Sequence, residues 1–304
     1  MEQQPRLVEE HIRKNKRDTV LICVFMVVLL FSVIFAIGWI LGAPPIFTMA
    51  IGLPIALFYI FITYSFSIQS VIAAAGARPA NPNNRDEKLL IYKVDEMAVA
   101  AGLPTPKVYV QDSRDINAFA TGHKAEDSII CATTGAIQQL DSEELEGVIG
   151  HEMSHIMNRD ILVMTVTVGV VGAIALLAEI AIRMLFWGGA ARGGGGKRDN
   201  GGGILILVAI IFIILAPIFS RLTYLAISRR REYLADADGA YLTRNPEGLA
   251  KALEKIKADI PDDPKGSKTV APLYIVNPFK RAMRDSIWST HPPIDERIRR
   301  LRSM

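Results

Sequence analysis

A chain of 304 residues, half of them hydrophobic, can hold one large or two small domains and is more apolar than most soluble proteins. A net charge of +3 is too small to indicate binding to nucleic acid, and no motif of interleaved aromatic and basic residues is present. The two cysteines, Cys23 and Cys131, form no C-x-x-C motif, and we expect them not to pair.

The chain starts with a long apolar region. No charged residue lies between Asp18 and Arg78, and the turn signal LGAPP at residues 41–45 interrupts this stretch. Because about 20 apolar residues suffice to cross a bilayer, we predict two transmembrane helices, over about 20–41 and 46–68. A cleaved signal peptide is not expected, since the first apolar run is too long and a second span follows almost at once.

The charges that flank this hairpin predict its orientation. The preceding tail, "RLVEEHIRKNKRD", is rich in Lys and Arg, whereas the turn inside the hairpin has neither. The positive-inside rule therefore places the N-terminus in the cytoplasm, and two spans return residues 70–160 to the same side. Together with the absence of a targeting peptide, this pattern favours the inner membrane of a prokaryotic cell.

Short elements follow the hairpin. The stretch "GARPANPNNRDEK" (76–88) is typical of a loop, and "EKLLIYKVDEMAVAAG" (87–102) has apolar residues at helical spacing, which predicts an amphipathic helix. The runs "KVYVQ", "INAFATG" and "DSIICAT" are rich in strand-forming residues and are separated by turns. We predict three short strands from these runs.

The strands lead into "QQLDSEELEGVIGHEMSHIMNRD" (138–160), which has the pattern of a helix with a capping box of Asp141 and Glu144. On a helix, His151 and His155 share one face because they are four residues apart, so both imidazoles can bind one metal ion. Glu152 lies about 100° around the helix axis, within reach of a water molecule on that ion. This is the H-E-x-x-H motif of zinc peptidases, in which the glutamate is the general base.

Two more apolar runs follow. Residues 161–187 are apolar except for Glu179 and Arg183, and residues 201–220 are uncharged. The segment between them, 188–203, is glycine-rich and typical of a flexible linker without chemistry of its own. We expect a second hydrophobic hairpin that returns the chain to the side of His151, either spanning the membrane or partly buried in protein.

A catalytic zinc ion usually has three protein ligands and one open position, so a third ligand is expected downstream. The stretch "SRRREYLADADGAYL" (228–242) carries Glu232 and Asp236 one helical turn apart. Glu232 can bind zinc, and Asp236 can accept the Nδ1–H of a ligand histidine and fix its tautomer. The alternative is a solvated acidic face that pairs with the neighbouring arginines.

In combination, "GHEMSHIMNRD", a hydrophobic hairpin and "SRRREYLADADGA" resemble the HtpX family of membrane-bound zinc metallopeptidases, relatives of the CAAX prenyl proteases. The resemblance covers nearly the whole chain. It implies one Zn²⁺ per chain bound by His151, His155 and Glu232, with Glu152 as general base and Asp236 behind the ligands. It also implies a role in the quality control of membrane proteins under stress.

Two further stretches share the resemblance. "RDINAFATG" (114–122) is similar to a strand beside the active site of the family, which implies that Asn117 faces the substrate; a turn residue is the alternative. A free strand edge beside the metal would bind an extended peptide through main-chain hydrogen bonds. "STHPPIDERIRRLR" (289–302) is similar to a C-terminal His-Pro segment, in which His291 would donate to the oxyanion; the alternative is a residue that orients the last helix.

We therefore predict an integral membrane protein, mainly α-helical with about four transmembrane helices, and a zincin-like α+β catalytic domain with a small β-sheet. The expected parts are a cytoplasmic tail (1–18), a transmembrane hairpin (19–72), the first part of the catalytic domain (73–160), the second hairpin (161–225) and the second part of the catalytic domain (226–304). The expected function is zinc-dependent cleavage of misfolded or damaged membrane proteins at the cytoplasmic face.

The expected partners are the lipid bilayer and protein or peptide substrates, without nucleic acid, and the sequence carries no signal for an oligomeric state. One alternative is a processing protease for lipidated C-termini, although the prenyl proteases carry more spans around a large chamber. A second is a non-catalytic membrane scaffold with structural zinc, which would need a fourth protein ligand. A transporter is a third, but only Glu179 and Arg183 are ionisable within the apolar runs.

Overall fold

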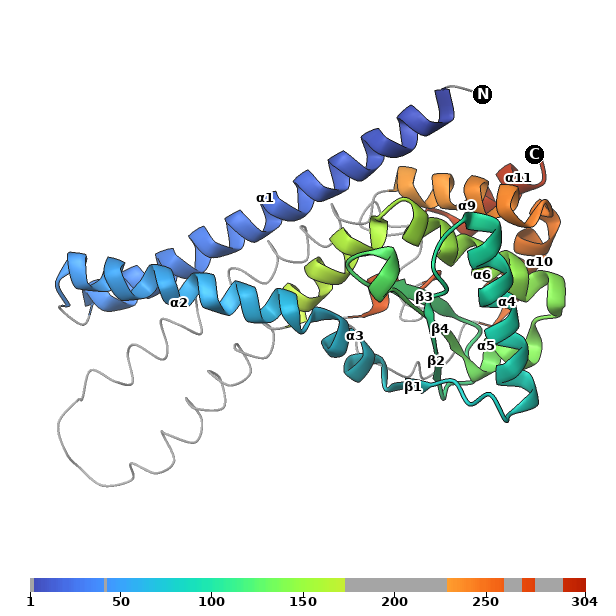
Figure 1. Ribbon diagram of the computed structural model, residues 1–304, viewed down its shortest axis with the longest axis horizontal. Coiled ribbons are helices and arrows are strands. Elements are labelled where there is room, and N and C mark those ends of the chain that lie inside the picture. Colours follow the sequence, from blue (N-terminus) through green and yellow to red (C-terminus); the bar gives the residue numbers. More distant parts are fainter. Residues whose placement is uncertain (1–2, 41–42, 173–228, 260–269, 277–291) are drawn as a thin grey trace.

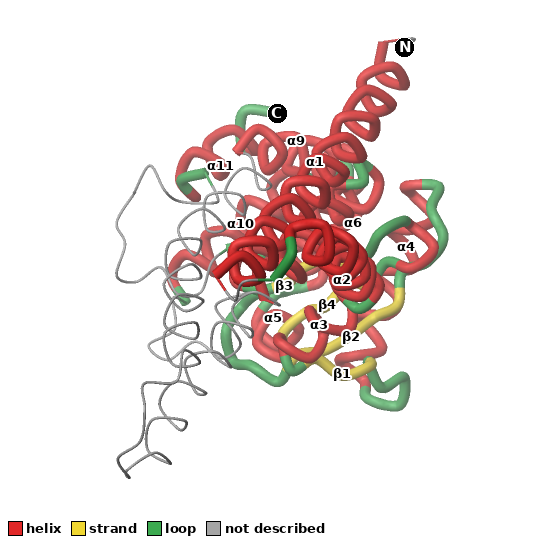
Figure 2. Tube along the Cα trace, turned by 90° about the vertical axis from the view of Figure 1, so that its left-hand side faces the viewer, coloured by secondary structure: helices red, strands yellow, loops and turns green. Residues whose placement is uncertain are grey.

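The computed structural model describes residues 3–40, 43–172, 229–259, 270–276 and 292–304. Two long helices, α1 (Gln3–Ile40) and α2 (Pro45–Ser65), lie side by side and project from a globular part that holds the sheet and the remaining labelled helices (Figures 1 and 2). Helices therefore cover most of the two predicted spans, about 20–41 and 46–68. The helix α1 also includes most of the tail 1–18, because it begins at Gln3.

Among the described residues, α2 is the helix that is long and apolar enough to cross a membrane, with a mean hydropathy of 2.2. Of the second predicted hairpin, the structure describes a shorter apolar helix, Asp160–Gly172. The rest of that hairpin, including Glu179, Arg183 and the glycine-rich segment 188–203, lies outside the described residues.

The globular part is built around a small mixed sheet with the strand order β1-β2-β4-β3. Its strands are β1 (Ala77–Pro79), β2 (Lys107–Gln111), β3 (Ala118–Thr121) and β4 (Ile129–Thr133). The pair β2–β4 is parallel, and β1–β2 and β3–β4 are antiparallel. The three strands expected from the sequence are confirmed as β2, β3 and β4.

The strand β1 lies in a stretch that the sequence predicted as a loop. It pairs with β2 by three residues, and Arg78 within it donates two hydrogen bonds to the carboxylate of Glu87, with N–O distances of 3.0 and 2.9 Å. Glu87 belongs to α4 (Arg85–Ala101), the expected amphipathic helix, whose first N–H groups are capped by the side chain of Asn84. The ion pair of Arg78 and Glu87 thus connects the edge strand β1 to the helix α4.

The other helices surround the sheet in Figure 1. They are α3 (Ser67–Ala75), α5 (Thr134–Gln139), α6 (Ser142–Met157), α9 (Arg229–Thr243), α10 (Pro246–Ala258) and α11 (Ile294–Leu301), with short 3₁₀ turns at Ala125–Asp127 and Ala271–Leu273. The main core buries residues from α4, α6, α10 and the sheet, among them Leu90, Val110, Ile130 and Ile149. The helix α6 contacts the strands β3 and β4 as well as the helices α4, α9 and α10.

The outer edge of β3 is not free, contrary to our expectation. The backbone N–H of Ile275 donates to the carbonyl of Ala118 over 2.9 Å, so a short segment of the C-terminal region lies along this edge. Tyr274 in the same segment is buried against Phe119 and donates its hydroxyl to Gln111 over 2.8 Å. The sequence offered no sign of this contact because it joins residues more than 150 positions apart.

Candidate metal centre

The helix α6 carries the H-E-x-x-H motif and begins with the predicted capping box. The carboxylate of Asp141 accepts from the N–H groups of Glu143 and Glu144, and Glu144 in return accepts from the N–H of Asp141. Leu145, Val148 and Ile149 on this helix are buried in the core. These contacts fix the rotation of the helix about its axis and place the motif inside the protein.

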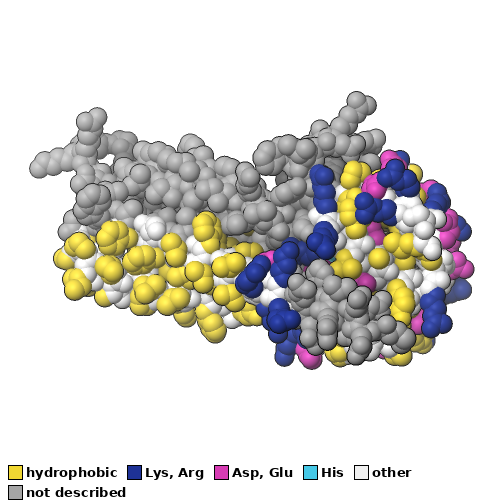
Figure 3. All heavy atoms as spheres, turned by 90° about the horizontal axis from the view of Figure 1, so that it is seen from above, with side chains coloured by type: hydrophobic (Ala, Val, Ile, Leu, Met, Phe, Trp, Pro, Cys, Tyr) yellow, Lys and Arg dark blue, Asp and Glu magenta, His cyan; other side chains and the backbone are white. Residues whose placement is uncertain are grey.

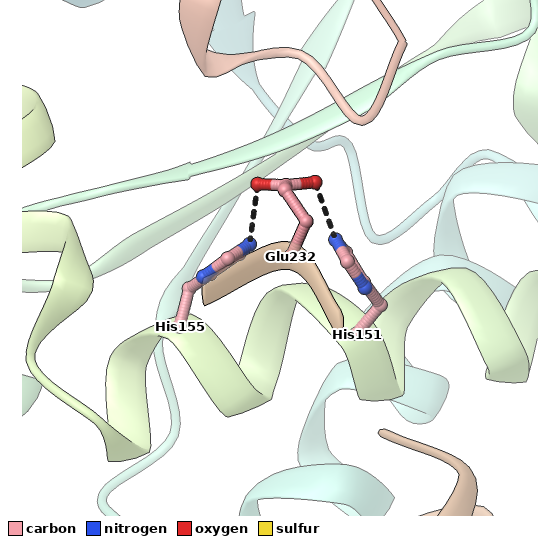
Figure 4. Close-up of side chains that lie close together, drawn as sticks. All are labelled: His151, His155 and Glu232. Atoms are coloured by element: carbon pink, nitrogen blue, oxygen red, sulfur yellow. Dashed lines mark ion pairs between the residues drawn. The ribbon is translucent and has the colours of Figure 1, made fainter. Parts of the chain in front are cut away.

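His151 and His155 lie on one face of α6, with their rings edge to face and the ring centroids 4.9 Å apart. Glu232 of α9 approaches both rings (Figure 4). Its carboxylate oxygens lie 3.9 Å from Nε2 of His151 and 3.7 Å from Nε2 of His155. One ligand atom from each of the three residues lies within 4.8 Å of the others, and all three side chains are buried.

This donor set suits a zinc ion. Three ligands at about 2.1 Å around a tetrahedral ion are separated by about 3.4 Å, close to the observed distances from Glu232 to the two rings. The Nε2 atom of His151 is buried and makes no hydrogen bond to any residue that the structure describes. A buried ring nitrogen without a hydrogen bond is costly, and a metal ion at this position would satisfy it.

Glu152 follows His151 on α6 and faces the strand β3. Its side chain is 2% exposed and accepts a hydrogen bond from the backbone N–H of Ala120. Burial, together with the negative charge of Glu232, raises the pKa of Glu152 to about 7, although the neighbouring His155 opposes this shift. A carboxyl group with this pKa can both accept and return a proton near neutral pH.

Each of the two histidines has a carboxylate behind it. Asp236 of α9 lies 3.0 Å from Nδ1 of His151, in the place that the sequence predicted. Asp160, at the start of the helix after α6, lies 3.0 Å from Nδ1 of His155. Because each carboxylate can accept the Nδ1 hydrogen, the neutral form of each ring would present Nε2 towards Glu232 without a hydrogen.

These carboxylates also influence proton affinity. Burial lowers the pKa of His155, but the hydrogen bond to Asp160 and the charge of Glu232 outweigh burial and raise it to about 9. Burial and the positive charge of Arg297 instead lower the pKa of His151, against the effect of Asp236. The two rings therefore differ in proton affinity although they occupy equivalent positions on one helix face.

Two residues at this centre were not predicted from the sequence. Asp160 reaches His155 because the chain turns sharply at Arg159, whose φ is +58°.

Arg297 of α11 is 1% exposed and donates to both oxygens of Asp236, over 2.9 and 2.7 Å. Burial raises the pKa of Asp236, yet Arg297 more than offsets this and holds it at about 2. Arg297 shares the inner face of α11 with Ile294, Ile298 and Leu301, and an arginine within an apolar stripe was the available signal.

The structure places Asn117 directly before β3, buried rather than exposed to solvent. Asn117 is 4% exposed, and its side-chain amide donates to the carbonyl of Val276 over 2.8 Å. The carbonyl oxygen of the same side chain accepts from the N–H of Ala118 over 3.1 Å. Asn117 thus contacts the main chain of an extended segment beside β3. His291 lies outside the described residues.

The chain is similar to known proteins over most of its length. Residues 84–304 match the model of Peptidase family M48. The chain is 43% identical to a protein named Protease HtpX homolog from Thermoanaerobacter pseudethanolicus over 96% of both chains. It is 39% identical to the protein of the same name from Streptococcus uberis, over 98% of this chain and all of that one. A structural match to S. mikatae Ste24p has a TM-score of 0.48 at 16% identity and covers 96% of this chain and 66% of that one.

Proposed function

The chain belongs to peptidase family M48 and is a metalloprotease, and on that premise we propose that it is a membrane-bound zinc endopeptidase that cleaves misfolded or damaged membrane proteins at the cytoplasmic face. One observation carries the proposal of zinc. Two imidazoles and one carboxylate converge in a buried site, with a fourth group, Glu152, beside them that has the properties of a general base. A structural zinc site would be closed by a fourth protein ligand, and the described residues supply three.

In this proposal, His151, His155 and Glu232 hold the ion. Zinc at this position would supply Lewis-acid activation of a water molecule and of the scissile carbonyl. Glu152 accepts the proton of the attacking water and then passes it to the leaving amine, which its pKa near 7 allows in both directions. Asp236 and Asp160 keep the Nδ1 hydrogens of the two rings in place, so that both Nε2 atoms stay available.

The segment beside β3 supports a binding mode for the peptide. Asn117 and the carbonyl of Ala118 hydrogen-bond the main chain of Val276 and Ile275, and such contacts do not depend on the side chains of the bound segment. We propose that an extended substrate displaces this segment and makes equivalent main-chain contacts along the same edge, with Asn117 as a binding residue. His291 is proposed as a donor to the oxyanion, because it opens the His-Pro segment three residues before the start of α11 at Ile294.

The surface of the projecting helices supports the proposed membrane location. Apolar side chains cover the visible part of these helices, and basic side chains gather where they meet the globular part (Figure 3). Val20, Val28, Phe58 and Phe61 are each more than half exposed. An apolar surface of this size is costly in water and is typical of a segment surrounded by lipid. The lipid bilayer is therefore the proposed environment of α1 and α2.

Metal analysis of the purified chain tests the zinc site. We expect one zinc per wild-type chain after dialysis in detergent, and at least a tenfold weaker affinity in Glu232→Gln, whose neutral amide is a poor ligand. Glu143→Gln on the exposed start of α6 is the matched control and should keep its zinc. Equal zinc content in the wild type and Glu232→Gln would refute the proposed ligand set.

The substrate class needs its own comparison. The enzyme in proteoliposomes would be given a destabilised membrane protein, its stable parent and a peptide with a lipidated C-terminus. We expect cleavage of the destabilised protein at a rate at least tenfold above that of its parent, because an unfolded segment can adopt the extended conformation that a strand edge binds. Preferential cleavage of the lipidated peptide would instead support the processing protease.

A further inference from the structure

The N-terminal helix contacts residues behind the metal centre through the polar side chain of Asn15. Asn15 is 3% exposed, although its neighbours Arg13, Lys14, Lys16 and Arg17 on α1 are exposed. Thr19, four residues on and therefore on the same helix face, is 5% exposed. This face of α1 thus contacts the globular part, and burial of an asparagine there requires hydrogen-bond partners.

The side-chain amide of Asn15 has three such contacts. Its two N–H groups donate to the carboxylate of Asp160 over 2.8 Å and to the carbonyl of Asn158 over 3.0 Å. Its oxygen accepts a hydrogen bond from the guanidinium of Arg231 over 3.4 Å. Both donors and the acceptor of the amide are therefore used, and the partners come from two different ligand-bearing regions of the chain.

These partners lie directly behind the proposed ligands. The Oδ1 atom of Asp160 accepts from Asn15, whereas the Oδ2 atom lies 3.0 Å from Nδ1 of His155. Asn158 follows α6, which carries both histidines, and Arg231 precedes the third ligand, Glu232, on α9. Asn15 consequently joins the end of one ligand helix to the start of the other.

We propose that Asn15 is a positioning residue for the metal centre, acting through Asp160 on His155, so that a helix we assign to the membrane hairpin is part of the metal site. This inference rests on the proposed zinc site. Fixing the carboxylate of Asp160 restricts the imidazole to the orientation in which Nε2 faces Glu232. Without the amide, the buried carboxylate loses one of its donors, and the ring is held less well.

Asn15→Leu tests the proposal, because leucine has a similar volume and no polar atoms. Partners behind a ligand histidine typically contribute 10- to 100-fold to metal affinity, and Asn15 is one contact further away, so we expect zinc affinity to fall by about 3- to 10-fold. Affinity would be measured on the full-length protein in detergent, by competition of zinc with a fluorescent chelator. Thermal unfolding of the metal-free protein would be recorded in parallel.

Thr19→Val is the matched control, since Thr19 lies on the same buried face of α1 and its hydroxyl donates to the carbonyl of Asn15 rather than to Asp160. It should lower the unfolding temperature of the metal-free protein about as much as Asn15→Leu but leave zinc affinity within twofold of the wild type. Equal zinc affinities in Asn15→Leu and Thr19→Val would overturn the proposal. Equal affinities are the result expected if Asn15 only holds α1 against the globular part.

Asn15→Asp is the second variant. It keeps an acceptor for Arg231 but replaces the donor to Asp160 by a carboxylate, so we expect a loss of zinc affinity at least as large as in Asn15→Leu. If neither Asn15 variant folds while Thr19→Val does, Asn15 is structural and the proposal is wrong. A double variant with His151→Ala and His155→Ala tests the metal site itself. If the wild type binds zinc no more tightly than this double variant, the proposed metal site is wrong, and the result says nothing against Asn15 in particular.

Discussion

We expect His155 and Asp160 to make zinc binding by this protein depend on pH. A zinc ligand must be a neutral imidazole, whereas the raised pKa of about 9 leaves His155 protonated in the metal-free protein at neutral pH. Zinc binding must therefore displace one proton below pH 9. We expect the apparent zinc affinity to rise about tenfold per pH unit between pH 6 and 8 and to level off above 9.

This pH dependence can be measured by chelator competition at a series of pH values, with correction for protonation of the chelator. Asp160→Asn is the informative variant, because an amide at this position removes the charge that favours the imidazolium. Its affinity should depend less steeply on pH and reach its plateau at lower pH. A wild-type affinity that does not change between pH 6 and 8 would contradict the assignment of His155 as a ligand.

At the scale of single residues, the sequence spacing predicted which side chains of one helix lie close together. His151, His155 and Glu152 follow from a period of 3.6 residues, and Glu232 with Asp236 follows from the same rule on a second helix. Asp160 was not predictable from that rule, because its position depends on the left-handed turn at Arg159. Arg297 was missed for a related reason, since its contact with Asp236 is made only when α11 packs against α9.

At the scale of elements, the close approach of α6 and α9 brings the third ligand to the first two. Gly239 on α9 faces α6 so closely that a Cβ atom there would lie 2.8 Å from the backbone nitrogen of His151. A side chain at residue 239 therefore has no room between the two helices. The distance between α6 and α9, and with it the place of Glu232, depends on this glycine.

Gly239→Ala should push α9 away from α6 and weaken zinc binding by at least tenfold. Gly248→Ala is the matched control, because its Cβ would lie 2.7 Å from the carbonyl oxygen of Glu143, at the contact of α10 with α6 and away from the ligands. Both variants should be destabilised, by about 1–3 kcal/mol for overpacking. Unfolding and zinc titration together test this prediction, which is wrong if Gly239→Ala binds zinc as well as Gly248→Ala.

Strands and helices could be predicted where several residues shared a hydrophobic period. They could not be predicted where contacts between distant residues decide the conformation of the chain. The strand β1 has three residues, one of them Pro79, so it carries no readable alternation. The ion pair of Arg78 and Glu87 joins this strand to α4, and no local sequence pattern indicates that contact. The segment at Ile275 on the edge of β3 likewise depends on a contact with Arg297, which donates to the Ile275 carbonyl over 3.0 Å.

At the scale of the whole molecule, one helix, α1, belongs both to the projecting hairpin and to the packing of the globular part. The helix α1 runs from Gln3 to Ile40, through the boundary that the sequence suggested between a tail and a membrane span. Its fourth turn contacts the globular part through Asn15, and its later turns expose apolar side chains such as Val24 and Val28. We propose that the membrane surface lies between these two regions, with the metal centre on the cytoplasmic side.

Cysteine accessibility tests this orientation. In a background with Cys23→Ser and Cys131→Ser, Ala43→Cys lies at the turn of the hairpin and Lys88→Cys lies on the exposed face of α4. A membrane-impermeant thiol reagent added to intact cells should label the first variant and not the second, and both after lysis. Labelling of Lys88→Cys alone in intact cells would place the metal centre on the outer side.

The central claim concerns the whole protein as a protease in which Glu152 is the base, and one comparison tests it most directly. Wild type and Glu152→Gln, each loaded with one zinc per chain, would be given the same unfolded protein substrate in detergent. We predict that the variant binds zinc normally and cleaves at least a hundredfold more slowly, within the range for loss of a general base. Equal rates of cleavage at equal zinc content would contradict the assignment of Glu152.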